Sequence, residues 1–106
     1  HELMHATGLQ LRLDSQVLPV RDPVISVCEM LGYDPLYLAC EGRIVAIVSP
    51  DAADEVLARW QALPEGQEAS IVGEVADGRQ RVVLVTELGG ERILEELEDD
   101  PLPRIC

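Results

Sequence analysis

The sequence lacks lysine and phenylalanine, and only 3% of its residues are aromatic. With one Trp and two Tyr available, a hydrophobic core must be built from Leu, Ile, Val and Ala. All 8 basic residues are Arg, against 20 Asp and Glu, and the formal net charge is −12. Binding to nucleic acid relies on clustered Lys and Arg. The sequence has no such cluster, so we expect no nucleic-acid partner.

Long apolar runs and paired cysteines are also absent. No run approaches the roughly 20 apolar residues that a membrane span needs, and no signal-peptide pattern opens the sequence. We therefore expect a cytoplasmic protein that binds no membrane. Cys28, Cys40 and Cys106 form no CxxC pair, so neither a disulfide framework nor a zinc site is predicted. His1 and His5 lack a third ligand and are expected at the surface.

The length of 106 residues suits one small domain, and the apolar fraction of 47% indicates a real core. The first seven residues are typical of the last turns of a helix that ends at Gly8. We therefore expect the chain to be a piece of a longer protein. Residues 1–97 are predicted to form a domain, and residues 98–106 an extended, mobile tail.

Apolar spacing and turn residues predict the elements of this domain. A helix is expected over 22–31, with Asp22 as its N-cap and Gly32 at its end. A second helix is expected to begin at Ser49-Pro50 and to end near Pro64. Residues 91–97 leave a short strand and a helical turn equally open. Strands are predicted at 9–13, 36–40, 44–48, 69–75 and 81–86.

The predicted order of elements is strand, helix, strand, strand, helix, strand. This βαββαβ order indicates an α+β, ferredoxin-like fold, with helices packed on a mixed, mostly antiparallel sheet. The middle two strands are expected to form a hairpin around Glu41-Gly42-Arg43, because glycine accepts the positive φ of such turns.

The C-terminal residues differ in kind from the rest of the chain. An acidic run, Glu95 to Asp100, precedes Pro101-Leu-Pro-Arg-Ile-Cys106. The alternating prolines exclude a helix and favour an extended, semi-stiff segment, so Pro101, Pro103 and Arg104 are expected to position the Cys106 thiol. Arg104 favours the reactive thiolate, whereas the acidic run and the terminal carboxylate oppose it. From composition alone, Cys106 is either a carrier thiol or an incidental end residue.

Other candidate groups have plain structural interpretations. Cys28 and Cys40 are expected to pack as small hydrophobic side chains. Glu41 at a hairpin is usually solvated, and a role as general base requires burial that the sequence does not reveal. Gly89-Gly90 lacks the GxxxxGK[ST] pattern of a phosphate loop, so no nucleotide site is predicted in this chain.

Five short motifs nevertheless resemble those of a known family. Gly32-Tyr-Asp-Pro-Leu36 and Leu38-Ala-Cys-Glu-Gly42 resemble the G-x-D-P-L and A-N-E-G signature of C-terminal domains in the aminoimidazole-ribonucleotide-synthetase superfamily. With Leu18-Pro-Val20, Gly89-Gly-Glu-Arg92 and the Pro101–Cys106 ending, the chain resembles the HypE family of carbamoyl dehydratases, which act in [NiFe]-hydrogenase maturation. The resemblance covers essentially the whole chain.

The resemblance implies a specific chemistry. Cys106 would receive a carbamoyl group from the carbamoyltransferase HypF, and ATP-dependent dehydration would leave a thiocyanate on the same sulfur. The cyano group would then pass to iron held by the HypC–HypD complex. Glu41 occupies the Glu of the signature and would accept a proton from the carboxamide nitrogen. Cys40 departs from the family, which usually has Asn there.

In this family, an N-terminal domain supplies the ATP and magnesium site and most of the homodimer contact. The resemblance therefore implies that the 106-residue chain alone binds no cofactor or metal and is inactive. Two alternatives remain open at this point. One is a non-catalytic ferredoxin-like interaction module whose acidic surface binds a basic partner. The other is the C-terminal domain of another ATP-dependent enzyme of the superfamily.

Overall fold

The structure is a computed structural model that describes residues 1–98. These residues fall into two compact units. The first unit comprises residues 1–19 and 46–95, and the second comprises residues 20–45 together with residues 96–98. The first unit carries the sheet, whereas the second carries one helix and a short 3₁₀ turn.

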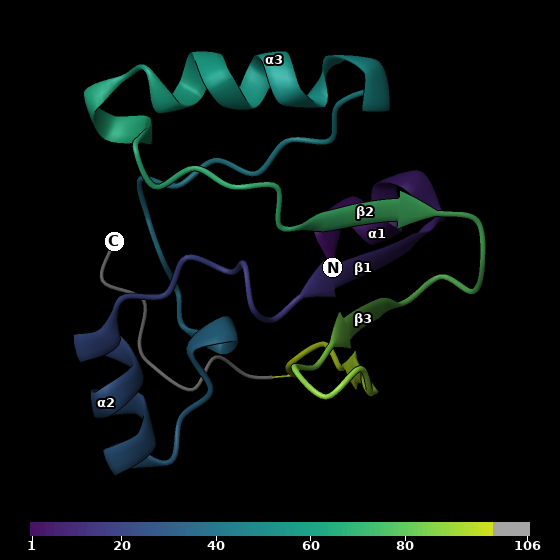
Figure 1. Ribbon diagram of the computed structural model, residues 1–106. Coiled ribbons are helices and arrows are strands. Elements are labelled where there is room, and N and C mark those ends of the chain that lie inside the picture. Colours follow the sequence, from purple (N-terminus) through teal and green to yellow (C-terminus); the bar gives the residue numbers. More distant parts are fainter. Residues whose placement is uncertain (99–106) are drawn as a thin grey trace. The chain divides into compact units, whose positions relative to one another are not determined.

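A four-stranded mixed sheet organises the first unit, in the order β2-β1-β3-β4. β1 pairs antiparallel with β2 and parallel with β3 (Figure 1). β3 also pairs antiparallel with β4. The α+β class and the mixed, mostly antiparallel sheet are thus confirmed. The segment that sequence left undecided contains a strand. The strands are β1 (Gln10–Asp14), β2 (Gly73–Ala76), β3 (Val82–Val85) and β4 (Glu91–Leu94).

The core of this unit lies around β3. Val82, Val83 and Leu84 are consecutive and all buried. Because successive strand residues point to opposite faces of a sheet, this run shows that β3 is covered on both faces. Leu94 of β4 and Met4 are also buried. The core is therefore aliphatic, as the composition predicts.

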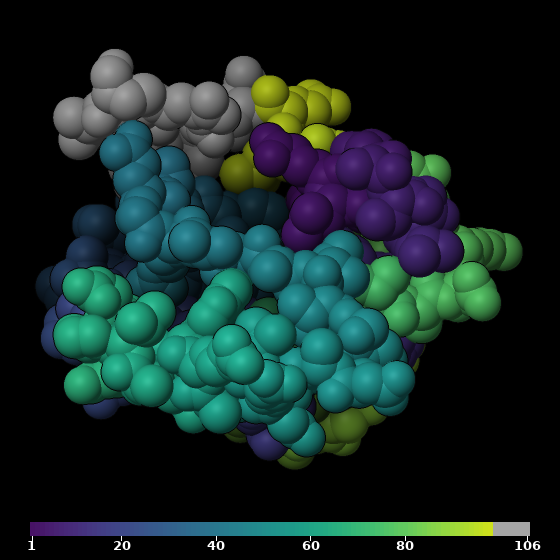
Figure 2. All heavy atoms as spheres, turned by 90° about the horizontal axis from the view of Figure 1, so that it is seen from above, coloured from purple at the N-terminus to yellow at the C-terminus, as the bar shows by residue number. Residues whose placement is uncertain are grey.

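A short helix, α1 (Glu2–Thr7), precedes β1 and ends at Gly8, whose φ of 70° is left-handed. The sequence predicts this end correctly, because glycine adopts positive φ without a Cβ clash. The Nε2 atom of His1 lies 2.8 Å from the carbonyl oxygen of Leu94. Figure 2 shows the N-terminal residues, in purple, beside the yellow residues of the β4 region. The first residue is thus held against the last strand.

The second helix of this unit, α3 (Pro50–Gln61), begins after Ser49 with proline as its first residue. The predicted start is therefore confirmed, although the Ser49 side chain makes no capping hydrogen bond. A 3₁₀ turn, η2 (Pro64–Gly66), follows the helix. Within residues 1–98, no helix is long and apolar enough to cross a membrane.

The second unit contains α2 (Asp22–Leu31) and the 3₁₀ turn η1 (Pro35–Tyr37). The predicted bounds of α2 are correct, but the prediction of Asp22 as N-cap is wrong. Arg21 takes the extended N-cap conformation, with φ −72° and ψ 142°, and Asp22 is the first helical residue. There its negative charge lies in the first turn, at the positive end of the helix dipole.

The predicted hairpin between strands 36–40 and 44–48 is also wrong. Residues 35–37 form η1, and residues 43–49 take no regular secondary structure. Apolar runs favour strands only when a neighbouring strand completes their hydrogen bonds. Along this run the side chains of Ile44, Val45, Ile47 and Val48 are exposed.

Truncation of the most buried valine should destabilise the chain. Val83 is only 1% exposed, so we expect Val83→Ala to lower the free energy of unfolding by about 2 kcal/mol. Val45→Ala removes the same atoms from a side chain that is 68% exposed. This substitution should change the free energy of unfolding by less than about 0.5 kcal/mol. Urea denaturation measures both values. Equal losses would contradict a core centred on β3.

Candidate functional site

The G-x-D-P-L motif connects α2 to η1 through backbone geometry. Gly32 ends α2 with a left-handed φ of 73°, and its N–H donates to the carbonyl oxygen of Cys28. Two residues later, the Asp34 carboxylate accepts a hydrogen bond of 3.0 Å from the Leu36 N–H. The Tyr37 N–H donates to the Asp34 carbonyl oxygen at 3.0 Å. The motif therefore caps a tight turn that folds the chain back along α2.

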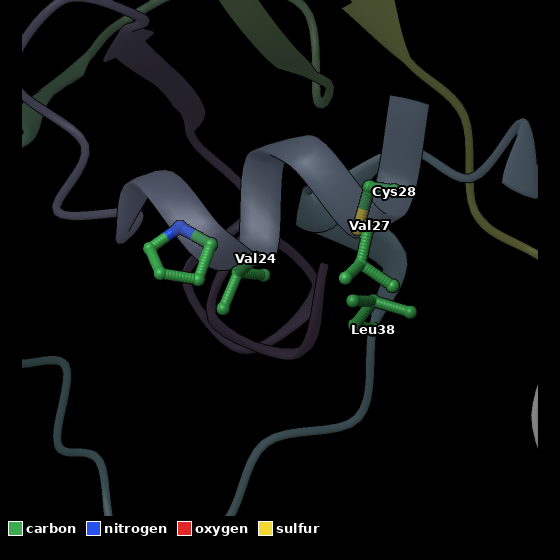
Figure 3. Close-up of a pocket in the computed structure, with 5 residues that line it drawn as sticks. Val24, Val27, Cys28 and Leu38 are labelled. Atoms are coloured by element: carbon green, nitrogen blue, oxygen red, sulfur yellow. The ribbon is translucent and has the colours of Figure 1, made fainter. Parts of the chain in front are cut away.

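This return of the chain forms an apolar hollow beside α2. Its volume is about 330 Å³. Figure 3 shows Val24 and Val27 projecting from the same side of the helix, with Leu38 opposite Val27. The hollow is lined by Pro23, Val24, Val27, Cys28 and Leu38. Among the residues that the structure describes, no charged side chain lines it.

A second hollow of about 280 Å³ shares Val24 and Leu38 with the first and has a basic character. Its charged lining residues are Arg21, before α2, and Arg43, after the Glu41-Gly42 turn. Cys40 also lines it. We refer to the two hollows together as the α2 groove: an apolar part along the helix and a part that carries two guanidinium groups.

Glu41 lies on the loop that leaves this groove. The residue is exposed, and it is followed by Gly42 with a left-handed φ of 73°. The sequence predicts the positive φ at Gly42 correctly, even though no hairpin forms around it. The Glu41 carboxylate is thus carried by a sharp, solvent-exposed turn, where it is open to another molecule or to another part of a longer chain.

The three cysteines have different positions. Cys28 is buried, as predicted for a small hydrophobic side chain on α2, and its thiol is free. Cys40 is exposed, so the prediction that it packs in a strand is wrong. The chain around it does not form that strand. Cys106 lies outside the described residues, as do Pro101, Pro103 and Arg104.

The two histidines do not form a metal site with other described groups. Between residues 1 and 98, no group of three or more His, Cys, Asp or Glu side chains is placed to hold a metal ion. His5 is exposed, and its Nδ1 atom lies 3.4 Å from Nε2 of Gln80. His1 is half-buried against β4 rather than at the surface, because its ring bonds the Leu94 carbonyl group.

The α2 groove does not fit ATP or Mg²⁺. Mg²⁺ requires oxygen ligands, usually carboxylates, and among residues 1–98 no carboxylate lines either hollow. A triphosphate is usually held by a glycine-rich loop at a helix N-terminus together with a Lys side chain, and the chain contains no Lys. Gly89, with φ 77°, instead forms part of the turn between β3 and β4.

The family comparison identifies the domain. The family described as "AIR synthase related protein, C-terminal domain" matches residues 1–86. The chain belongs to this family. The match covers most of the first compact unit, up to the end of β3, and residues 20–45 of the second, which carry the G-x-D-P-L motif, the α2 groove and Glu41.

Several curated relatives of this chain are named carbamoyl dehydratase HypE. The carbamoyl dehydratase HypE of Azotobacter vinelandii is 42% identical over 107 aligned positions, which cover 100% of this chain and 31% of the relative. The HypE of Escherichia coli K12 is also 42% identical, with the same coverage of both chains. The chain thus spans about a third of the length of the curated relatives it matches.

Solved structures agree with this assignment. The crystal structure of E. coli HypE, described as a hydrogenase maturation protein, matches with a TM-score of 0.91 and 40% identity, over 100% of this chain and 33% of that one. A HypE structure in complex with ATP matches with a TM-score of 0.87 and 34% identity, over 94% and 32%. A HypE–HypF complex matches with a TM-score of 0.86 and 34% identity, over 91% and 31%.

The groove residues were not identified as a site from the sequence. The sequence predicts a strand around Leu38. It predicts connecting segments at Arg21 and Arg43. The available signal was the Asp34-Pro35 pair, because an Asp followed by Pro favours a capped turn over a continuous strand.

Loss of the Asp34 cap should loosen η1. The carboxylate satisfies the Leu36 N–H, so Asp34→Ala should destabilise the turn by about 1 kcal/mol. Local opening would then expose the buried Cys28 thiol about fivefold more often. Alkylation of Cys28, resolved by mass spectrometry, measures this rate. Asp34→Asn keeps an acceptor oxygen and should react like the unchanged chain. Identical rates in all three chains would contradict the role of the cap.

Proposed function

We propose that this chain is the C-terminal domain of a carbamoyl dehydratase that makes cyanide ligands for [NiFe] hydrogenase, with Cys106 as the carrier thiol. The observation that carries the proposal is the match to carbamoyl dehydratases along 100% of the chain, which includes its terminal residues. A thiol that must reach a donor, a dehydrating site and an acceptor needs to be carried by a long segment. A proline-rich segment has few conformations, so it loses less conformational entropy each time it docks.

The proposed reaction takes place entirely on one sulfur atom. Cys106 loses its thiol proton as its sulfur forms a C–S bond to the carbamoyl carbon, and the bond between that carbon and its carrier group on HypF breaks, so the carrier group stays with HypF. Dehydration removes the carbamoyl oxygen as phosphate, with ATP converted to ADP, and removes both nitrogen protons to leave S–C≡N. Transfer of cyanide to iron breaks the S–C bond. Two electrons from a reductant on the acceptor side are then needed to regenerate the thiolate.

Glu41 is proposed to accept a proton from the carboxamide nitrogen during dehydration. Two observations support this role. Glu41 carries a carboxylate that can accept a proton, and the residue is exposed on the turn that ends at the left-handed Gly42. A carboxylate that abstracts a proton from a group carried by a moving arm must be open to that arm. In the free domain, Glu41 satisfies this requirement.

ATP, magnesium and the partner proteins are assigned to the longer protein. A related HypE has been solved with ATP and another in complex with HypF, which supports both assignments. We further propose homodimerisation, delivery to HypC–HypD and a cytoplasmic location. Because the α2 groove does not fit a nucleotide, we expect the 106-residue chain by itself neither to hydrolyse ATP nor to dehydrate a carbamoyl group.

Carbamoylation should be confined to Cys106. Full-length protein, incubated with HypF, carbamoyl phosphate and ATP, should carry one carbamoyl or cyano adduct on this residue, and Cys106→Ala should carry none. Peptide mapping by mass spectrometry measures the position. The exposed Cys40 is the matched control, and Cys40→Ala should keep the adduct. No adduct with active HypF would favour a non-catalytic interaction module. Full activity after removal of Ile105 and Cys106 would favour another enzyme of the superfamily.

Replacement of Glu41 should separate the two chemical steps. In the full-length protein, Glu41→Gln should leave carbamoylation intact and slow dehydration by about 10²- to 10⁴-fold, the usual contribution of a general base. Carbamoyl-Cys106 should accumulate in place of the thiocyanate, and the two adducts differ in mass. Glu29→Gln changes another exposed glutamate of the same unit and should have no effect. Normal thiocyanate formation by Glu41→Gln would remove Glu41 from the mechanism.

A further inference from the structure

The apolar surface of α2 is only partly covered by η1 and Leu38 among the described residues. Only Cys28 of this helix is buried. Val27 is 53% exposed and Met30 is 84% exposed, and Val24, Ile25 and Leu31 are exposed as well. Contiguous exposed apolar residues beside a hollow indicate a surface that another segment covers.

The sequence offers one segment of suitable length and composition. Residues 99–106 follow Glu98, and Glu98 belongs to the same compact unit as the groove. Eight residues in an extended, proline-rich conformation span about 25 Å, whereas the ten residues of α2 span about 15 Å. A segment that leaves this unit at Glu98 is therefore long enough to run the whole length of the helix.

The chemistry of the segment matches both parts of the groove. Leu102 and Ile105 are apolar and match the hollow lined by valine and leucine side chains. The prolines reduce the conformational freedom that docking removes. Acidic residues dominate the stretch from Glu95 to Asp100, and the charged residues that line the second hollow are Arg21 and Arg43.

We propose that the α2 groove is a docking site for the C-terminal segment of the same chain. Leu102 and Ile105 occupy the apolar part, and the acidic residues before Pro101 lie toward Arg21 and Arg43. The docked state holds the Cys106 thiol against its own domain between reactions. Docking competes with every visit of the thiol to another protein. This docking proposal does not depend on the carbamoyl chemistry proposed above, and its test needs no partner enzyme.

Limited proteolysis of the 106-residue chain tests this proposal. Trypsin cleaves the bond after Arg104 and releases Ile105-Cys106, which mass spectrometry resolves from the other cleavages. The reference is a free peptide of residues 95–106, which has the same cleavage site without the groove. Docking should slow cleavage after Arg104 by about tenfold relative to the peptide. Concentrated salt should reduce this protection, because it screens the charge pairing.

Two substitutions on α2 locate the docking site. Val27→Gln makes one wall of the groove polar and should restore the cleavage rate of the free peptide. Met30→Gln places the same side chain at an exposed position that does not line the groove, and it should keep the protection. Circular dichroism confirms that each variant is folded. If Val27→Gln does not fold, Val24→Gln tests the same wall.

Three results would overturn the proposal. Equal cleavage of the chain and the peptide would show that the segment does not dock. Protection that survives both Val27→Gln and Val24→Gln would place the segment elsewhere. Protection that disappears on dilution of the chain would show that a second copy, not the same chain, occupies the groove.

Discussion

The parallel pairing of β1 with β3 is the constraint on which the rest of the described structure depends. Leu11 to Asp14 pair with Val82 to Val85, and parallel neighbours cannot be joined by a tight turn. The chain between them must leave the sheet and return. α2, the groove beside it, Glu41 and α3 all lie on this long connection. The candidate site thus belongs to a crossover segment, whose apolar residues on α2 are mostly exposed, whereas those of β3 are buried.

The elements that the sequence predicts well are those with local causes. Gly8 and Gly32 end helices because their positive φ is a property of the residue itself. Proline at the start of α3 acts in the same way. The strands at 36–40 and 44–48 were predicted from apolar runs, and such runs need a partner strand to become sheet. No local pattern reveals whether that partner is present.

The candidate site was predictable only in part. The resemblance to a known family makes Glu41 and Cys106 candidates, whereas the residues alone leave Glu41 as an ordinary solvated glutamate. The α2 groove was not predicted, because it exists only when η1 brings Leu38 back to Val24 and Val27. In the structure, Gly32 and Asp34 of the family motif build this turn. The motif therefore has a structural role in addition to marking the family.

The contact between His1 and the Leu94 carbonyl group has a consequence for how this domain is connected. It brings residue 1 and the last strand of the sheet unit to the same place, although the chain also leaves that unit after residue 19 and returns at residue 46. Units with adjacent ends tolerate circular permutation and insertion into other chains. Residues 1 and 94 are therefore a pair of neighbouring positions at which the strand order of the sheet would survive joining or cutting of the chain.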